Sequence, residues 1–217
     1  MGPTLLLDLD GTLVDTVPDL AAALNRVMAA RGLAPFTEAE TARMVGDGVA
    51  TLIARAFAAR GRTPDATAVA DYAADPALFV PRASRPFPGV VAGLATLAEA
   101  GWRLAVCTNK PEAAARSLLE QLGIGGFMAA IGGGDSFPVR KPDPAHLVAT
   151  LRAAGGVAER AIMAGDHAND VAAARGAGIP AIFAAWGYGP AEMADGAAAV
   201  AQDATEMVRI ARAMMDA

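Results

Sequence analysis

The chain has 217 residues, a length that fits one core with a modest insertion better than two complete domains. Its hydrophobic share of 54% with 19% charged residues is typical of a globular protein and argues against extended disorder. The net charge is −5 and the 18 basic residues are scattered, which argues against a nucleic acid or an anionic membrane as partner.

The N-terminal residues carry neither the basic start nor the long apolar run of a signal peptide, and no other segment reaches membrane-spanning length without interruption. The single cysteine, Cys107, cannot form an internal disulfide, which favours a reducing compartment. We therefore expect a soluble cytoplasmic protein.

Short apolar runs closed by turns indicate strands that are buried on both faces, and helical patterns lie between them. The expected strands cover residues 4–9, 103–108, 128–131, 161–165 and 181–185, and the expected helices cover residues 90–100, 112–122 and 205–215. This alternation predicts a doubly wound, Rossmann-like α/β core around a parallel sheet.

Residues 15–85 break the alternation, because they show helical periodicity and no convincing strand. Two apolar stripes with helical spacing stand out: Leu20, Leu24, Val27 and Met28, and then Val49, Leu52, Ile53, Ala56 and Phe57. We predict an α/β catalytic core over residues 1–14 and 86–217, and a small inserted helical cap domain over residues 15–85. Residues 15–18 and 82–86 are the expected linkers, and we expect the cap to open and close.

Polar side chains follow the expected strands at their carboxyl ends, where parallel α/β sheets bind ligands. Asp8 and Asp10 straddle one residue, and Gly11 lets backbone N–H groups approach an anion closely. Thr108 and Asn109 offer a hydroxyl and an amide to a phosphoryl oxygen. Each motif alone is also ordinary turn chemistry.

Two later motifs complete the set. Lys141 precedes a proline-stiffened helix start, where on its own it would be interpreted as a surface lysine. Asp166 and Asp170 lie four residues apart and share a face as a helix begins. Carboxylates so arranged repel each other unless a divalent cation neutralises them, and Mg²⁺ suits all-oxygen ligands. Together the motifs predict a phosphoryl-transfer site with Mg²⁺ as its cofactor.

With these motifs in order, the chain resembles the haloacid dehalogenase (HAD) superfamily over essentially its whole length. The matching residues are Asp8 to Thr12, Thr108-Asn109, Lys141-Pro142, and Gly165-Asp166 with Asp170. The insertion looks like the small helical cap of that superfamily. Three further segments look like its phosphoglycolate phosphatase branch: Val45 to Gly48, Thr108 to Pro111, and Gly187 to Gly189.

The resemblance implies a magnesium-dependent phosphatase that forms an aspartyl-phosphate on Asp8, with Asp10 as general acid and base. It implies that Thr108 and Lys141 stabilise charge on the phosphoryl oxygens. It further implies a metal site made of Asp8, the backbone carbonyl of Asp10 and Asp166. The same resemblance gives Asp170 the part of a supporting ligand.

The expected substrate is a small phosphorylated metabolite, most specifically 2-phosphoglycolate. Its carboxylate would need a cation from the cap, and Arg43 and Arg55 flank a loop in which Gly46 offers backbone N–H groups. Gly11 and Asn109 are the substrate-binding residues expected from the core. A monomer and a homodimer both fit the sequence.

For three further residues we predict a structural position rather than a role in catalysis. His167 stands where the family usually has a small hydroxyl residue, and we expect a partly exposed residue at a helix start. We expect His146 on a helix surface and Cys107 in the core.

Other functions stay open at this point. A sugar-phosphate mutase of the β-phosphoglucomutase type and a pyrophosphatase share the core and cap type. A non-catalytic phosphorylation switch or binding module is a remoter alternative. The helical insertion argues against a receiver-type switch, and the retention of Asp8, Asp10 and Lys141 argues against a degenerate binding module.

Overall fold

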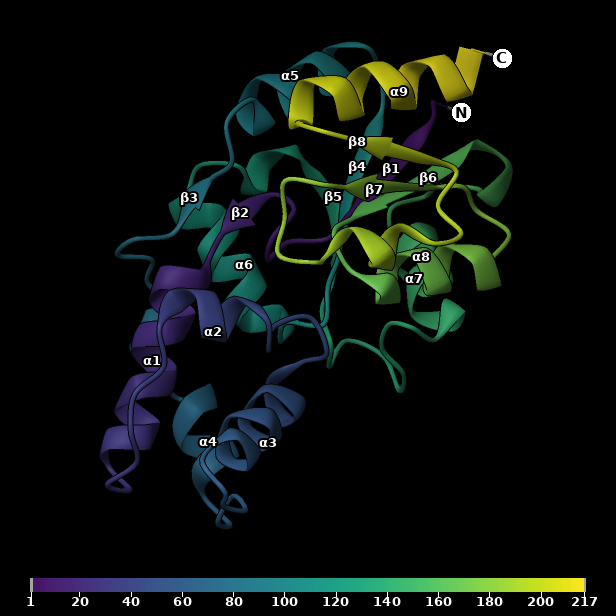
Figure 1. Ribbon diagram of the computed structural model, residues 1–217. Coiled ribbons are helices and arrows are strands. Elements are labelled where there is room, and N and C mark those ends of the chain that lie inside the picture. The colour runs from purple at the N-terminus through teal and green to yellow at the C-terminus, as the bar shows by residue number, and fades with distance from the viewer. Residues whose placement is uncertain (1, 217) are drawn as a thin grey trace.

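The computed structural model describes residues 2–216, and its centre is a sheet of six parallel strands in the order β5-β4-β1-β6-β7-β8 (Figure 1). The strands are β1 (Thr4–Leu7), β4 (Arg103–Cys107), β5 (Met128–Gly132), β6 (Ala161–Gly165), β7 (Ala181–Ala184) and β8 (Ala199–Ala201). Since β4 and β6 flank β1, the order of the strands reverses at β1. The carboxyl end of β1 is therefore the place where a doubly wound sheet binds its ligand.

Helices cover both faces of this sheet, and β1 shows why its sequence is apolar throughout. Leu5 and Leu7 pack on one face with α5 (Val90–Glu99), α6 (Glu112–Gln121) and α9 (Ala204–Asp216). Leu6 points to the other face, where α7 (Pro144–Ala153) and α8 (Ala168–Gly176) lie. Figure 1 shows α5 and α9 on one side of the sheet and α7 and α8 on the other. The predicted α/β class with a parallel, doubly wound sheet is confirmed.

Short 3₁₀ segments connect the longer elements, and none of them changes the class of the fold. They are the 3₁₀ turns η1 (Pro76–Leu78), η2 (Gly125–Phe127), η3 (Ala158–Arg160) and η4 (Ala191–Ala194). Within residues 2–216, no helix combines the length and the apolar character that crossing a membrane requires.

The inserted segment forms a second helical cluster with its own apolar core. It contains α1 (Val17–Ala29), α2 (Glu38–Ala42), α3 (Val49–Ala59) and α4 (Ala68–Ala73). The two expected stripes face each other inside it, with Leu24 and Ile53 fully buried and Val49 partly buried at the edge. Whether this cluster is an independent domain with boundaries at residues 15 and 85 stays a prediction.

Two short strands join the cluster to the sheet, although we expected no strand between residues 15 and 85. β2 (Val14–Asp15) and β3 (Arg85–Pro86) pair antiparallel, so the entering and leaving segments lie side by side. The Asp19 carboxylate in α1 then accepts the backbone N–H groups of residues 82–84. Both connections are therefore held together at the base of the cap.

Candidate active site

The loop after β1 begins the site. Asp8 is the first residue beyond the strand and its N–H donates to the Ala164 carbonyl at 2.9 Å, which fixes it against β6. Gly11 has φ +88°, and a Cβ there would collide with the Asp166 carboxylate, so this turn requires glycine. The Gly11 N–H itself donates to the Val14 carbonyl at 3.0 Å, which closes the turn rather than facing the pocket.

Three buried carboxylates meet at the edge of the sheet. Oxygen atoms of Asp8, Asp166 and Asp170 lie within 4.8 Å of one another. Thr12 Oγ1 and the Tyr188 N–H each donate to Asp166 at 2.8 Å and hold its carboxylate in place. Burial and the charge of Asp8 together raise the pKa of Asp166 to about 7. This cluster can hold a metal ion, because a divalent cation would offset the repulsion that the shift reflects.

Lys141 is the cation nearest to these acids. Its Nζ lies 2.6 Å from Asp170 Oδ1 and 2.9 Å from Asp8 Oδ1, but only the contact with Asp170 has the geometry of a hydrogen bond. Asp8 Oδ1 is consequently buried without a hydrogen-bond partner among residues 2–216. Burial opposes the charge on Lys141, yet the neighbouring Asp170 and Asp8 raise its pKa above the usual value. A buried carboxylate oxygen without a hydrogen bond, beside two further carboxylates, fits a hard divalent cation.

His167 starts α8, as expected for a partly exposed residue at a helix N-terminus. Its N–H donates to Asp170 Oδ2 at 3.0 Å, and its Nδ1 accepts from the Asn169 N–H at 3.3 Å, which forms a capping box. The ring also rests on the cap loop. A Cβ on Gly46, whose φ is +119°, would come within 2.6 Å of the His167 ring.

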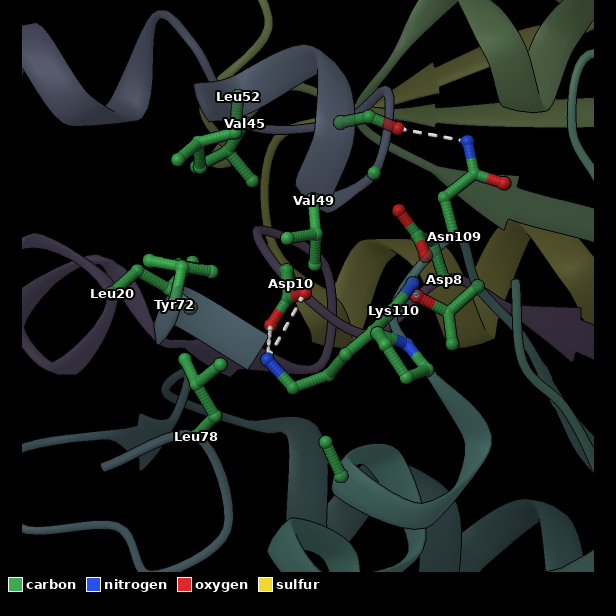
Figure 2. A pocket seen from close by; sticks show the side chains of 15 residues that line it. Asp8, Asp10, Leu20, Val45, Val49, Leu52, Tyr72, Leu78, Asn109 and Lys110 are labelled. Carbon is green, nitrogen blue, oxygen red and sulfur yellow. Dashed lines mark hydrogen bonds and ion pairs between the residues drawn. The ribbon is translucent and has the colours of Figure 1, made fainter. Parts of the chain in front are cut away.

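Thr108 and Asn109 follow β4 and are both buried. The Asn109 amide donates to the Gly46 carbonyl at 2.9 Å and to the Lys141 carbonyl at 3.0 Å, and the first of these bonds is dashed in Figure 2. Gly46 therefore offers a carbonyl oxygen to the core, whereas we expected it to present N–H groups to the substrate. Asn109 ties the cap loop to the loop that carries Lys141.

Lys110 is a site residue that the sequence motifs quoted above contain but did not single out. Its Nζ lies 3.2 and 3.4 Å from the two carboxylate oxygens of Asp10, and its side chain is only 6% exposed. One signal could have found it. Lys110 and Lys141 are the only lysines of the sequence, every other basic residue being arginine.

Two cavities meet over Asp8 and Asp10, and both pass beneath the cap loop that contains Gly46. The first has about 540 Å³, part of it open to solvent, and lies between Lys110 and an apolar wall (Figure 2). That wall consists of Leu20, Val45, Val49, Leu52, Tyr72 and Leu78. The second has about 630 Å³ and extends past Asp166 and His167 toward Arg43.

The two candidate arginines differ in their position relative to the cavities. Arg55 is exposed, pairs with Asp47 at 2.5 Å and donates to the Met44 carbonyl at 3.1 Å. It lines neither cavity. Arg43 is also exposed, but it lines the second cavity.

His146 is buried, so its expected place on a helix surface was wrong. Its position in α7 shares the buried face with Leu147, Thr150 and Leu151, because α7 packs that face on the sheet. His146 Nε2 lies 2.9 Å from the Gly133 carbonyl, and Nδ1 lies 3.5 Å from Cys107 Sγ. The expected core position of Cys107 is confirmed, and burial raises the pKa of its thiol to about 12.

Tyr188 connects the acidic cluster to the cap. Its N–H donates to Asp166 Oδ2, while its hydroxyl accepts the Thr16 N–H at 2.7 Å and donates to Asp15 Oδ1 at 2.8 Å. The neighbouring Gly187 has no room for a Cβ, because Asp166 fills that space. The Gly187 to Gly189 segment thus links a carboxylate of the site to the segment that enters the cap.

The carboxylates cluster at the topological switch point of an α/β core, beneath helices of the inserted segment. This arrangement is typical of phosphoryl-transfer hydrolases. The family model of the haloacid dehalogenase-like hydrolases matches residues 3–178. The chain belongs to this family.

Relatives agree with this assignment. The phosphoglycolate phosphatase of Agrobacterium fabrum is 45% identical over 87% of this chain and 82% of its own length. That of Mesorhizobium japonicum is 46% identical over 86% and 84%. The chain is a phosphoric monoester hydrolase of the branch that its motifs resembled.

Solved structures share the fold over almost the whole chain. A protein from Haemophilus somnus described as a predicted phosphoglycolate phosphatase superimposes with a TM-score of 0.88 at 27% identity, covering 96% of this chain and 97% of that one. CbbY from Rhodobacter sphaeroides, solved in complex with xylulose 1,5-bisphosphate, superimposes with a TM-score of 0.79 at 26% identity. The shared coverage there is 95% of this chain and 96% of CbbY.

Proposed function

We propose that this protein hydrolyses 2-phosphoglycolate to glycolate and phosphate through an aspartyl-phosphate on Asp8, with Mg²⁺ as cofactor. The observation that carries the proposal is the buried Asp8 oxygen that faces Lys141 without a hydrogen bond, in a chain whose relatives at 45% and 46% identity are named phosphoglycolate phosphatase. A nucleophile needs a lone pair available for the phosphorus atom, and among residues 2–216 no hydrogen bond is donated to Asp8 Oδ1.

Asp8 attacks phosphorus, and the bond between phosphorus and the ester oxygen breaks as the Asp8–phosphorus bond forms. Asp10 protonates the leaving oxygen of glycolate, and it then takes a proton from the water that hydrolyses the aspartyl-phosphate. The two carboxylates can divide these roles because their surroundings differ. Asp8 lies in the acidic cluster, whereas Asp10 is paired with Lys110.

Lys141 and Thr108 stabilise the charge on the phosphoryl oxygens. Lys141 is held in place by Asp170, so its ammonium is positioned before the substrate arrives. Thr108 is buried, and its hydroxyl accepts the Lys110 N–H at 3.2 Å, which leaves its own proton for an acceptor in the pocket.

Asp8, Asp166 and the backbone carbonyl of Asp10 would hold Mg²⁺, with Asp170 in support. When bound, the ion supplies positive charge to the phosphoryl group and the nucleophile. The all-oxygen donor set favours Mg²⁺ over softer metals.

A turnover assay over a panel of phosphate esters tests the proposal. The panel contains 2-phosphoglycolate, β-glucose 1-phosphate, xylulose 1,5-bisphosphate and pyrophosphate, each assayed with Mg²⁺ and after exhaustive chelation. We expect the highest kcat/KM for 2-phosphoglycolate, with activity lost on chelation and restored by Mg²⁺. Asp8→Asn is the inactive control, because an amide does not attack phosphorus effectively.

Different results would point to different errors. A hexose phosphate, the bisphosphate or pyrophosphate preferred by about tenfold or more would refute the substrate while leaving the chemistry in place. Full activity after chelation would refute the metal, and an active Asp8→Asn protein would refute the mechanism.

A further inference from the structure

We propose that Lys110 of the core and Tyr72 of the cap form a subsite for the carboxylate of the substrate. The inference rests on the proposed function, and it names the residues that select the substrate within the same site. Lys110 and Tyr72 thereby take the place of Arg43 and Arg55 as the proposed ligands of the substrate carboxylate.

Lys110 is placed to meet an anion in the first cavity. Within residues 2–216 it is the one basic residue among those that line this cavity, and it projects beneath the cap residues labelled in Figure 2. The wall opposite is apolar, so an ammonium there is poorly hydrated and gains more from a negative partner than it would on the surface. An ammonium has three donors, and the two oxygens of Asp10 leave at least one for another acceptor.

Tyr72 supplies the second observation. This residue of α4 is 2% exposed and lines the same cavity, and its hydroxyl has no hydrogen-bond partner among residues 2–216. Buried hydroxyls are nearly always partnered, so an unpaired one in a cavity wall points to a ligand acceptor. Burial, with the charge of Asp10, raises the pKa of Tyr72, so the phenol keeps its proton and can donate it.

The substrate has the dimensions for this arrangement. In 2-phosphoglycolate the carboxylate carbon stands two bonds from the ester oxygen, which Asp10 protonates. Lys110 stands one hydrogen bond beyond Asp10, so its ammonium lies within the range that the carboxylate can reach. Arg55 and Arg43 do not line this cavity and would have to leave their present positions to do the same.

The rival explanation is that Lys110 only orients Asp10. The two explanations differ in one ratio, because a residue that acts through Asp10 affects every ester, whereas a carboxylate ligand affects only esters that carry one. The matched substrate is the phosphate ester of glycolamide, which has the same shape as 2-phosphoglycolate and no carboxylate charge. Selectivity is defined as kcat/KM for 2-phosphoglycolate divided by kcat/KM for the glycolamide ester.

We expect Lys110→Met to lower this selectivity by about 10- to 100-fold, because a charge-assisted bond is lost. Lys110→Arg should retain part of it. Tyr72→Phe should lower it by about 3- to 10-fold, since its bond is that of a neutral hydroxyl. Arg116→Met, which removes an exposed cation paired with Glu112 on α6, is the matched control and should leave selectivity unchanged.

If Lys110→Met lowers kcat/KM equally for both esters, the inference is overturned and the proposed function stands. A wild-type protein that hydrolyses 2-phosphoglycolate without preferring it to the glycolamide ester would lead to the same conclusion. A wild-type protein that is inactive on 2-phosphoglycolate but active on other esters would instead overturn the proposed function.

A binding measurement decides the matter without turnover. Because the chain has two lysines, Asp8→Asn protein labelled with ¹³C at lysine gives two Cε signals, which Lys110→Met assigns. In Mg²⁺, both 2-phosphoglycolate and ethyl phosphate should shift the Lys141 signal, which reports that the phosphoryl site is filled. Only 2-phosphoglycolate should shift the Lys110 signal substantially. Equal Lys110 shifts, or none, with both ligands at saturation would refute the subsite.

Discussion

Asp8 and Asp10 are separated by one residue but meet different partners, and this difference follows from the path of the loop. Asp8 points into the acidic cluster with Asp166 and Asp170, while Asp10 points toward Lys110. Equivalent carboxyl groups in different surroundings are how enzymes separate a nucleophile from a proton donor. The roles can be separated by experiment.

We expect Asp10→Asn to lower kcat on alkyl phosphates by roughly 10²- to 10⁴-fold, because proton transfer to the leaving oxygen is lost. With p-nitrophenyl phosphate, whose leaving group needs little protonation, the variant should instead release a burst of nitrophenolate and then stall as the phosphoenzyme. Rapid-mixing absorbance measures both phases. A loss below about tenfold on alkyl phosphates, or a stall without any burst, would contradict the assignment.

The meeting of Asp8, Lys141, Asp166 and Asp170 could be predicted from the sequence, because the ends of parallel strands share one edge of a sheet. The roles of Lys110 and Tyr72 could not be predicted in this way. Tyr72 lies 60 residues after Thr12 and 36 residues before Thr108, and it reaches the site only through the docking of the cap, which no local pattern encodes. Arg43 and Arg55 are suggested by their charge and by their positions beside the Gly46 loop, but no pattern in the sequence predicts the Asp47–Arg55 ion pair.

At the scale of elements, the cap helices α1 and α3 could be predicted from their stripes, whereas the short helices α2 and α4 and the strands β2, β3 and β8 were not predicted. Strands β2 and β3 have two residues each and β8 has three, too few to show a period-two pattern. β2 and β3 nonetheless determine how the cap leaves the core, together with Asp19 and Tyr188.

Asp19→Asn tests the bonds at the base of the cap. Burial alone would raise the pKa of Asp19, but its bonds from Ser84, Ala83 and Arg82 outweigh burial and hold the pKa below the usual 3.8. The resulting stability is fully present above the pKa of an unfolded aspartate, about 3.9, and is lost as pH falls through the lower folded value. We expect the variant to lose about 1.5–3 kcal/mol of unfolding free energy near neutral pH.

Urea denaturation over a series of pH values measures this loss, and the gap between wild type and variant should narrow below a pH of about 3.9. Asp195→Asn, at an exposed position after η4, is the control. If the difference in unfolding free energy between wild type and Asp19→Asn stays the same at every pH down to full protonation, the charge of Asp19 is not the cause of that difference.

Tyr188→Phe separates the two links made by that residue. The variant loses the hydroxyl bonds to Thr16 and Asp15 but keeps the backbone N–H that Asp166 accepts. We expect a loss of about 1–2 kcal/mol in unfolding free energy, with an unchanged Mg²⁺ requirement. Gly187→Ala, in contrast, should raise the Mg²⁺ concentration that activity requires, because its new methyl group would displace Asp166. Mg²⁺ titrations of activity, together with denaturation curves, distinguish the two variants. A raised Mg²⁺ requirement in Tyr188→Phe would show that its hydroxyl bonds and its link to Asp166 are not independent.

At the scale of the whole molecule, the acidic cluster joins β1, β6 and α8, so an ion bound there ties the centre of the sheet together. We expect Mg²⁺ at about 100 times its Kd to add about 2.7 kcal/mol to the unfolding free energy and to raise the Tm accordingly. Differential scanning fluorimetry measures the shift. Asp166→Asn should abolish most of it, and a full Mg²⁺ shift in that variant would remove Asp166 from the site.

The unusual placement of the lysines has a consequence for the surface of the molecule. Both lysine side chains lie in the site and are 6% exposed for Lys110 and 2% for Lys141, while arginine carries the positive charge elsewhere. A reagent that acylates lysine side chains therefore finds no exposed lysine on the surface of this protein. If the cap opens and closes as predicted, the rate at which these amines are acylated in the native protein measures how often it opens, and a saturating phosphate ester should lower that rate.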